Sequence, residues 1–300
     1  MKPYWTGVFP ACTTQLKKDQ SLDLLATARH LEALIESGVS GLIMCGSLGE
    51  NQTLTLAEKL AVLQCAVETA RGRVPVLSGV AESATATAIQ YVREAKKLGV
   101  RGVMLMPAMS YKGDPRETMT YLRTVATGGG LPVMIYNNPI SYANDVTPAM
   151  FAELADEKKF VAIKESSGDP RRITELRNTV GDRYALFTGV DDLLLEASIL
   201  GIDGWVAGSS IAFPKENQQL WNLTREGRWD EARTLYRWAQ PLLKLDTHVH
   251  FVQYIKLLEQ ETGLGSEWVR APRLTLAGDE RKRVLKIIRD ALKARPKVKR

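Results

Sequence analysis

Eight short apolar segments recur along the first two thirds of the chain, and stretches with helical periodicity separate them. Each segment is an unbroken apolar run rather than an alternation of polar and apolar residues, which is typical of strands buried on both faces. The segments cover residues 8–11, 41–45, 74–80, 102–106, 133–137, 160–164, 185–189 and 204–208. This repetition predicts a parallel sheet that helices cover on both sides.

The intervening stretches carry the start and stop signals of helices. Residues 22–37 place an apolar stripe on one face and end before Gly38, a residue typical of the position after a helix. Residues 56–71 and 83–98 also end before a glycine. Prolines at positions 115, 148 and 170 mark three further helix starts, because proline is favoured in the first helical turn. A helix over residues 191–200 follows the seventh strand.

Eight strands that alternate with helices favour a (β/α)8 TIM barrel of the α/β class, with an open doubly wound sheet as the alternative. After residue 208 only helical patterns follow, over residues 214–226, 229–245, 249–261 and 279–294. Residues 1–212 are therefore predicted to hold the barrel strands and most barrel helices. Residues 213–300 hold the last barrel helix and a C-terminal helical extension with a basic tail, of which residues 295–300 are expected to be disordered.

The net charge of the chain argues against a nucleic-acid partner. The 300 residues carry 40 Lys and Arg against 34 Asp and Glu, a formal charge of 40 − 34 = +6. Residues 281–300 hold ten of these cations and one acid, a net of +9, so residues 1–280 carry 6 − 9 = −3. The basic character therefore belongs to the C-terminal end and not to the body of the protein.

Cysteine usage and hydropathy predict a cytoplasmic protein without a membrane partner. The cysteines, Cys12, Cys45 and Cys65, lack CxxC spacing and an even framework, which suits a reducing compartment. No signal peptide is evident, and no apolar run reaches the roughly 18 residues that a transmembrane helix needs.

Lysine 164 ends the sixth predicted strand, and the active site of such a barrel lies at the C-terminal strand ends. Partial burial lowers the pKa of a lysine, and a neutral amine can attack a ketone to form a Schiff base. The alternative is a lysine paired with a neighbouring carboxylate. Tyr136 ends the fifth strand and could shuttle a proton at the same mouth, or could be a core tyrosine whose hydroxyl is satisfied.

Three other features admit weaker interpretations. The glycine-rich turn at residues 46–51 could bind a carboxylate through its amides, but it lacks the Gly-Lys-Ser/Thr of a phosphate-binding loop. Asp191 could cap the following helix or bind a polar substrate. His248 and His250 would point to different faces of a helix with no third ligand, so we expect no metal site. His30 is expected to be structural.

Four motifs in this order resemble those of the dihydrodipicolinate synthase/N-acetylneuraminate lyase family of Schiff-base aldolases, and the likeness covers nearly the whole chain. The motifs are residues 7–14 (GVFPACTT), 46–50 (GSLGE), 136–139 (YNNP) and 163–169 (IKESSGD). The resemblance implies that Lys164 forms the imine and that Tyr136 shuttles protons, while Ser47 relays protons or holds the substrate carboxylate. It extends the expected substrate-binding residues to Leu48, Gly49, Asn138, Gly189, Asp191 and Ser209.

The resemblance also implies the requirements of the reaction and the assembly of the protein. No metal or organic cofactor is expected, because the protonated imine serves as the electron sink. The expected partner is a small 2-oxo acid or a cyclic imino acid, and the expected assembly is a homotetramer.

Departures from the family pattern bear on the substrate. Leu48 replaces the second hydroxyl of the carboxylate loop, so backbone amides would carry more of that binding. Dihydrodipicolinate synthases carry an arginine where Ser141 stands, and their additional tyrosine after the fourth strand aligns with Met109, while Tyr111 is offset. We therefore do not expect lysine-pathway synthase activity. Residues 189–192 resemble the hydroxyl-binding segment of the neuraminate lyases.

A narrower likeness is to the subgroup that deaminates 1-pyrroline-4-hydroxy-2-carboxylate in hydroxyproline breakdown. Residues 8–15 and 245–249, together with Leu48, resemble that subgroup. The expected activity is therefore conversion of this cyclic imino acid to 2-oxoglutarate semialdehyde and ammonia. The alternatives are 4-hydroxy-tetrahydrodipicolinate synthase, an aldolase or dehydratase of N-acetylneuraminate or 2-keto-3-deoxy sugar acids, and a non-catalytic small-molecule sensor on the same barrel.

Overall fold

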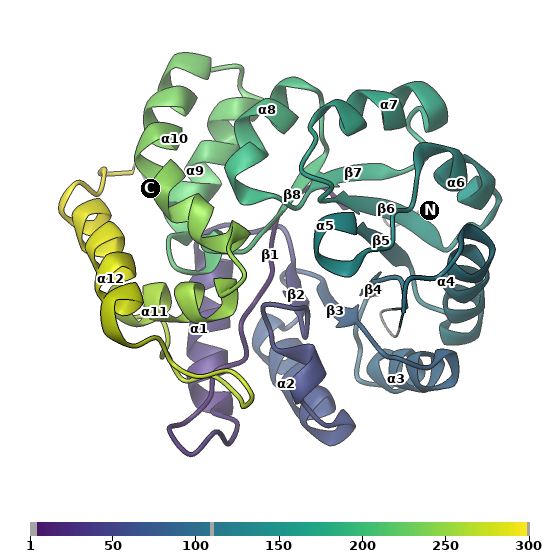
Figure 1. Ribbon diagram of the computed structural model, residues 1–300, viewed down its shortest axis with the longest axis horizontal. Helices are drawn as coiled ribbons and strands as arrows, with labels where there is room; N and C mark the ends of the chain where they lie inside the picture. Colours follow the sequence, from purple (N-terminus) through teal and green to yellow (C-terminus); the bar gives the residue numbers. More distant parts are fainter. Residues whose placement is uncertain (1–4, 109–110, 299–300) are drawn as a thin grey trace.

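Eight parallel strands form one sheet at the centre of the protein (Figure 1). The computed structural model describes residues 5–108 and 111–298, and all strand statements refer to these. The strands are β1 (Gly7–Pro10), β2 (Leu42–Met44), β3 (Val76–Val80), β4 (Gly102–Leu105), β5 (Val133–Asn137), β6 (Phe160–Glu165), β7 (Ala185–Thr188) and β8 (Gly204–Ala207). The eight predicted apolar segments are thereby confirmed as strands.

The sheet is a barrel and not an open sheet. Its hydrogen-bonded order is β1-β8-β7-β6-β5-β4-β3-β2, and β1 pairs with β8 through the register Gly7↔Gly204. A parallel bridge between Ala11 and Ile43 joins the two remaining edges. The predicted TIM barrel is confirmed, and the doubly wound alternative is excluded by this closure.

Helices cover the outside of the barrel and form the C-terminal extension (Figure 1). The α-helices are α1 (Leu24–Glu36), α2 (Leu56–Ala70), α3 (Thr85–Lys97), α4 (Pro115–Gly129), α5 (Pro139–Tyr142), α6 (Pro148–Glu153), α7 (Arg171–Val180), α8 (Leu194–Ile199), α9 (Pro214–Arg225), α10 (Trp229–Leu243), α11 (Phe251–Thr262) and α12 (Gly278–Lys293). The short 3-10 helices are η1 (Asn51–Thr53), η2 (Leu154–Asp156), η3 (Asp191–Leu193), η4 (Ser209–Ile211) and η5 (Lys244–Thr247).

The predicted helix signals act as expected at most ends. Asp114 and Thr147 accept backbone hydrogen bonds as N-caps, and Pro115 and Pro148 occupy the first helical positions. The four-residue helix α5 was not predicted, because it is too short to show a period. Its start is nevertheless marked by Asn138, whose side chain accepts the amide of Ser141, and by Pro139.

Two aromatic side chains pack closely against glycines at the starts of neighbouring strands. Phe9 and Phe187 pack edge to face with ring centroids 5.5 Å apart. A β-carbon at Gly41 would lie 2.1 Å from the Phe9 ring, and one at Gly204 would lie 2.1 Å from the Phe187 ring. These two glycines are therefore needed because the rings approach the backbone closely. One contiguous apolar core includes residues of the barrel segment 1–212 and of the C-terminal segment 213–300.

Buried charges attach the C-terminal extension to the barrel mouth. Lys256 on α11 donates to Glu50 at 2.6 Å, with both side chains fully buried, and also to the carbonyl of Trp268 at 2.6 Å. Glu259, also buried, accepts hydrogen bonds from Thr13 at 2.8 Å and from Gln15 at 3.2 Å. Burial of these charges is tolerated because each has close partners.

The structure bears on two further predictions, the role of His30 and the disorder of residues 295–300. His30 is structural as expected, since it is buried between the carbonyl of Ile211, at 2.8 Å, and the Glu259 carboxylate, at 3.1 Å. The predicted disorder of residues 295–300 is wrong for Arg295, which forms an ion pair with the buried Glu216 at 2.5 Å. The physical reason is that the buried carboxylate of Glu216 needs a positively charged partner, which Arg295 provides.

We expect Lys256→Met to destabilise the fold by about 3–5 kcal/mol, because it leaves the buried Glu50 carboxylate without its main partner. Urea denaturation at neutral pH would measure the loss. The matched control is Lys286→Met, which removes an exposed i,i+4 pair with Asp290 and should leave the free energy of unfolding nearly unchanged. Equal effects of the two substitutions would contradict this account of the buried pair.

Candidate active site

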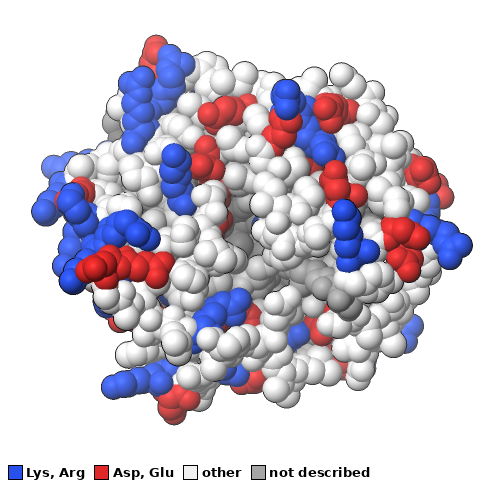
Figure 2. All heavy atoms as spheres, in the orientation of Figure 1, with Lys and Arg blue, Asp and Glu red and all other residues white. Residues whose placement is uncertain are grey.

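A cavity of about 590 Å³ opens at the C-terminal ends of the strands. Figure 2 shows this face hollowed near its centre, with charged side chains mostly around its edge. Six of the predicted site residues line the cavity, namely Lys164, Tyr136, Ser47, Leu48, Asn138 and Gly189. The fold thus brings together residues from four different strand ends, as expected for a barrel enzyme.

Lys164, on β6, is the central cation of this cavity. Its side chain is 6% exposed, and its Nζ lies 3.9 Å from the centroid of the Tyr136 ring. Burial lowers the pKa of Lys164 below its ordinary value, while the negative charge of Asp246 acts in the opposite direction. The lowered pKa favours the neutral amine, which is the nucleophilic form.

Gly189 provides the space that Lys164 occupies. A β-carbon at position 189 would lie 2.2 Å from Cε of Lys164 and 2.3 Å from Oγ of Ser166. Gly189 is therefore needed because any larger residue after β7 would clash with the side chain of Lys164.

Tyr136, on β5, is the direct neighbour of Lys164 in the sheet, because the two residues pair in register. Its hydroxyl accepts a hydrogen bond from Nδ2 of Asn138 at 3.0 Å. Burial raises the pKa of Tyr136 above its ordinary value. The phenol is therefore held neutral and oriented beside the amine, where it can exchange a proton with a bound imine.

Tyr142, which ends α5, is a site residue that the sequence analysis missed. Its hydroxyl is hydrogen-bonded to Oγ of Ser47, and its ring packs edge to face on Tyr136 with centroids 5.7 Å apart. The three hydroxyl side chains Ser47, Tyr142 and Tyr136 thus form a continuous group along one wall of the cavity. The only signal in the sequence was the Asn138-Pro139 helix start, which turns the chain so that Tyr142 returns to the mouth.

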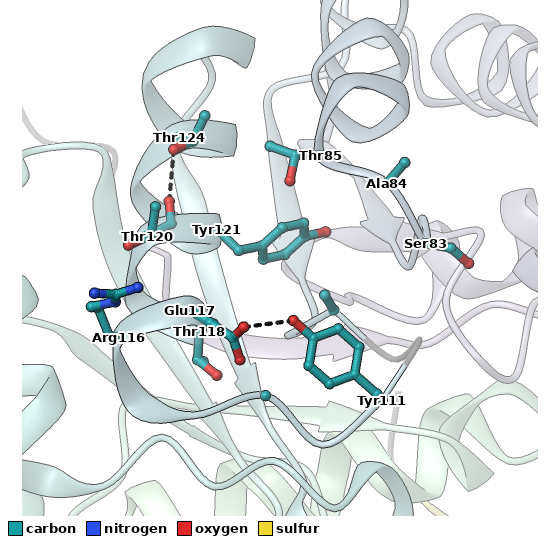
Figure 3. Close-up of a pocket in the computed structure, with 12 residues that line it drawn as sticks. Ser83, Ala84, Thr85, Tyr111, Arg116, Glu117, Thr118, Thr120, Tyr121 and Thr124 are labelled. Carbon is teal, nitrogen blue, oxygen red and sulfur yellow. Dashed lines mark hydrogen bonds between the residues drawn. The ribbon is translucent and has the colours of Figure 1, made fainter.

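Tyr111 does not take part in this group. It borders a second cavity of about 440 Å³ between α3 and α4, where its hydroxyl donates to Glu117 at 2.9 Å (Figure 3). Met109, the predicted replacement for the additional tyrosine of the family, lies outside the described residues. The tyrosine hydroxyl that contacts Ser47 is that of Tyr142.

The carboxylate loop after β2 presents Ser47 and Leu48 to the cavity, whereas Gly49 does not line it. A β-carbon at Gly49 would lie 2.9 Å from the carbonyl oxygen of Cys12, so this glycine allows the loop to pack on β1. The amides of Glu50 and Asn51 donate to carbonyls of the same turn, at 3.1 and 3.2 Å. Those two amides therefore do not serve a ligand.

Asp191 and Ser209, which we expected to bind substrate, lie outside the cavity wall. Asp191 is completely buried and accepts hydrogen bonds from Nε1 of Trp205 at 3.0 Å and from the amides of Gly208 and Ser209 at 3.2 and 2.7 Å. Its carboxylate oxygens are thus used to hold the turn after β8 in place.

Asp246, in η5 of the C-terminal extension, is the second residue that the sequence analysis did not select. Among the described residues that line the cavity it is the one acidic side chain. Its carboxylate lies against the backbone of Gly208, where a β-carbon would be 2.1 Å from Oδ1. The sequence signal was the run 245–249, which contributed to the subgroup resemblance without assigning a role to Asp246.

The two histidines of the extension are arranged differently from our prediction. They are not on opposite faces of a helix, because η5 ends at Thr247 and α11 starts at Phe251. Their ligand atoms and that of Glu280 all lie within 4.8 Å of one another, so a third potential ligand is present. Glu280 accepts hydrogen bonds from Nδ1 of His250 at 2.8 Å and from the hydroxyl of Tyr254 at 2.7 Å. These contacts connect the start of α11 with α12.

Comparison with known proteins was made by sequence and by structure. The model of the Dihydrodipicolinate synthetase family matches residues 4–291. A 4-hydroxy-tetrahydrodipicolinate synthase of Methanosphaerula palustris is 31% identical over 241 residues, which are 79% of this chain and 82% of that protein. The same enzyme of Methanosarcina mazei is 30% identical over 270 residues, 89% of this chain and 91% of that protein.

Solved structures agree with these matches. A dihydrodipicolinate synthase of Acinetobacter baumannii complexed with pyruvate has a TM-score of 0.91 and 25% identity, covering 96% of this chain and 99% of that one. A prophage protein of the same family from Escherichia coli K12, also in complex with pyruvate, has a TM-score of 0.88 and 27% identity, covering 96% and 99%.

The lowered pKa of Lys164 has a measurable consequence for its reactivity. The neutral fraction of an amine rises as the pH rises through its pKa, so we expect half-maximal formation of a borohydride-trapped pyruvate adduct below pH 10.5, the ordinary lysine value. Quenched single-turnover reactions across a pH series, read by intact mass, would measure this midpoint. A midpoint at or above 10.5 would contradict the effect of burial, and Lys164→Arg should form no adduct at any pH.

Tyr142→Phe removes the hydroxyl that contacts Ser47 and should slow exchange of the pyruvate methyl protons with deuterium by about 10²-fold, the usual size of a lost acid–base group. Proton NMR of pyruvate in deuterated buffer would follow the exchange. Tyr111→Phe, which removes a hydroxyl outside this cavity, is the matched control and should exchange at the unmodified rate. Unchanged exchange in Tyr142→Phe would exclude Tyr142 from proton transfer.

Proposed function

The chain belongs to the dihydrodipicolinate synthetase family of Schiff-base lyases, and from this premise we propose that it deaminates a 4-hydroxylated cyclic imino acid, 1-pyrroline-4-hydroxy-2-carboxylate. The products are 2-oxoglutarate semialdehyde and ammonia. The observation that carries the proposal is the composition of the cavity wall, in which Lys164 and Tyr136 lie together with Asp246, while Ser141 occupies the position of the synthase arginine.

The wall of the cavity suits a substrate with one carboxylate and one hydroxyl. Ser141 cannot form an ion pair with the second carboxylate that a synthase must hold. Arg273, a cation that also lines the cavity, lies 3.7 Å from the carboxylate of Glu50. Asp246 offers no positive charge to a second carboxylate, whereas it can form a hydrogen bond with a hydroxyl or an amine.

The proposed reaction begins with attack of the Lys164 amine on the ring C=N carbon. Transimination then frees the ring nitrogen as an amine, and the new imine acidifies the adjacent carbon. Tyr136, with Ser47, moves that proton, and the 4-hydroxyl leaves as water. The remaining double bond shifts to give an imine at C5, which hydrolyses to release ammonia. A second hydrolysis frees the product from Lys164, and the residues present need no metal or organic cofactor for these steps.

A second candidate is 4-hydroxy-tetrahydrodipicolinate synthase, which the names of the relatives favour. It shares imine formation by Lys164 and would need another group to hold the carboxylate of the second substrate. A sugar-acid aldolase or dehydratase would share the same lysine. We also propose a homotetramer, which the family resemblance implies, and a cytoplasmic location.

No helix in the described parts of the chain combines the length and the apolar character needed to cross a membrane.

A product assay distinguishes these candidates. The purified protein is incubated separately with 1-pyrroline-4-hydroxy-2-carboxylate, a 2-keto-3-deoxy sugar acid, N-acetylneuraminate, and pyruvate with aspartate semialdehyde. We expect ammonia and 2-oxoglutarate semialdehyde from the cyclic imino acid alone, and neither from the Lys164→Ala variant. Condensation of pyruvate with aspartate semialdehyde and no ammonia would establish the synthase instead. A protein that forms no adduct with any 2-oxo acid would have to be regarded as a sensor.

A further inference from the structure

We propose that Asp246 is the catalytic acid that protonates the departing hydroxyl group of the substrate, and that it thereby directs the Lys164 imine toward loss of water. This inference rests on the proposed function and deepens it. It assigns a separate group to the second proton transfer of the reaction and defines the substrate class as 2-oxo acids, or their cyclic imines, with a hydroxyl two carbons from the imine carbon.

The first argument is the position of Asp246 relative to Lys164. The strands follow one another in the order β5, β6, β7, β8 around the barrel. Tyr136 is on β5 and Lys164 on β6, while the carboxylate of Asp246 lies against Gly208 directly after β8. The amine that carries the substrate therefore has the phenol on one side and the carboxylic acid on the other.

The glycine positions keep the space between these groups open. Gly189, which follows β7, lies between the lysine and the β8 end, and its missing side chain leaves room for Cε of Lys164. Gly208 leaves room for the carboxylate itself, since any β-carbon there would lie within 2.7 Å of all three atoms of the carboxyl group. A substrate attached to Lys164 can thus extend over Gly189 toward Asp246.

The other acids at this end of the barrel are already used. Asp191 accepts three hydrogen bonds from Trp205, Gly208 and Ser209, and Glu50 is paired with the buried Lys256. Glu165 accepts hydrogen bonds from Asn137 and from the amide of Ser167. Asp246 is the acid among the described residues whose carboxyl group faces the cavity instead.

The surroundings of Asp246 favour the protonated form that an acid catalyst needs. Burial, and then the charge of Asp191, raise its pKa well above the ordinary value, although the charge of Lys164 acts in the opposite direction. A neutral carboxylic acid can donate a hydrogen bond to a hydroxyl oxygen, whereas a carboxylate can only accept one. The donating form assists departure of the oxygen, while the accepting form would instead promote cleavage of the carbon–carbon bond by removing the hydroxyl proton.

The elimination balances in electrons and protons and needs no oxidant, reductant or other reagent. During transimination Tyr136 gives its proton to the departing ring nitrogen and becomes a phenolate. The C3–H bond then breaks, its proton passes to this phenolate oxygen, and its electron pair forms the C2=C3 bond of the enamine. That pair then forms C3=C4 as the C4–O bond breaks. The departing oxygen keeps the pair from that bond and takes the proton of Asp246, which gives water. Solvent returns a proton to the Asp246 carboxylate, and no group is oxidised or reduced.

The test separates imine formation from elimination in an Asp246→Asn variant. Amide and acid are nearly the same size, but the amide has no acidic proton to give. Imine formation is read by borohydride trapping of pyruvate, and enamine formation by deuterium exchange of the pyruvate methyl group. Both should stay within about threefold of the unmodified protein. Loss of water from the cyclic imino acid and from a 2-keto-3-deoxy sugar acid should fall by about 10²-fold or more.

The matched control is Asp279→Asn, which removes an exposed acid of the same extension, on α12, that does not line the cavity and should leave elimination unchanged. Elimination at the normal rate in Asp246→Asn would overturn the proposal. An equal loss of borohydride trapping, deuterium exchange and elimination would also overturn it. That result would mean that Asp246 influences the reactivity of Lys164 and does not protonate the leaving group. An unmodified protein that dehydrates the sugar acid but not the cyclic imino acid would refute the proposed function and leave the role of Asp246 intact. Dehydration of neither substrate would overturn both.

Discussion

Closure of the parallel sheet is the constraint on which the other features depend. The strands are hydrogen-bonded from β1 through β8 around to β2, and the bridge between Ala11 and Ile43 completes the ring. A closed parallel barrel directs all C-terminal strand ends to one mouth, so polar residues placed there must meet. The register Tyr136↔Lys164 is one consequence, because a shift of one residue would turn the lysine to the opposite face of the strand.

The C-terminal extension completes the site rather than merely covering the barrel. The buried pair of Lys256 with Glu50, and the hydrogen bonds of Glu259 to Thr13 and Gln15, fix α11 against the loops of the mouth. With α11 fixed, η5 delivers Asp246 to the cavity that holds Lys164. The same electrostatic contacts that stabilise the fold therefore also position an acidic group that faces the cavity.

The burial of Lys164 combines a cost in stability with a gain in the reactivity of its amine. Burial disfavours the ammonium form of Lys164, and the contact with the Tyr136 ring compensates only in part. Sites that carry out chemistry often retain such unfavourable features because function requires them. Here the unfavourable feature is the one that favours the neutral, nucleophilic form of the amine.

The sequence by itself determined the strands, most helices, the barrel and the position of Lys164 and Tyr136, because these depend on local signals. Unbroken apolar runs mark strands buried on both faces, and a polar residue at the end of such a run must lie at the mouth. The sequence could not show α5, which is too short to have a period, and so it could not place Tyr142 beside Ser47. It also could not show that the carboxylate of Asp191 is used within the fold. Only the tertiary structure decided that Asp246, from a separate helical segment, is the acid in the cavity, because that contact depends on how the extension packs over the barrel.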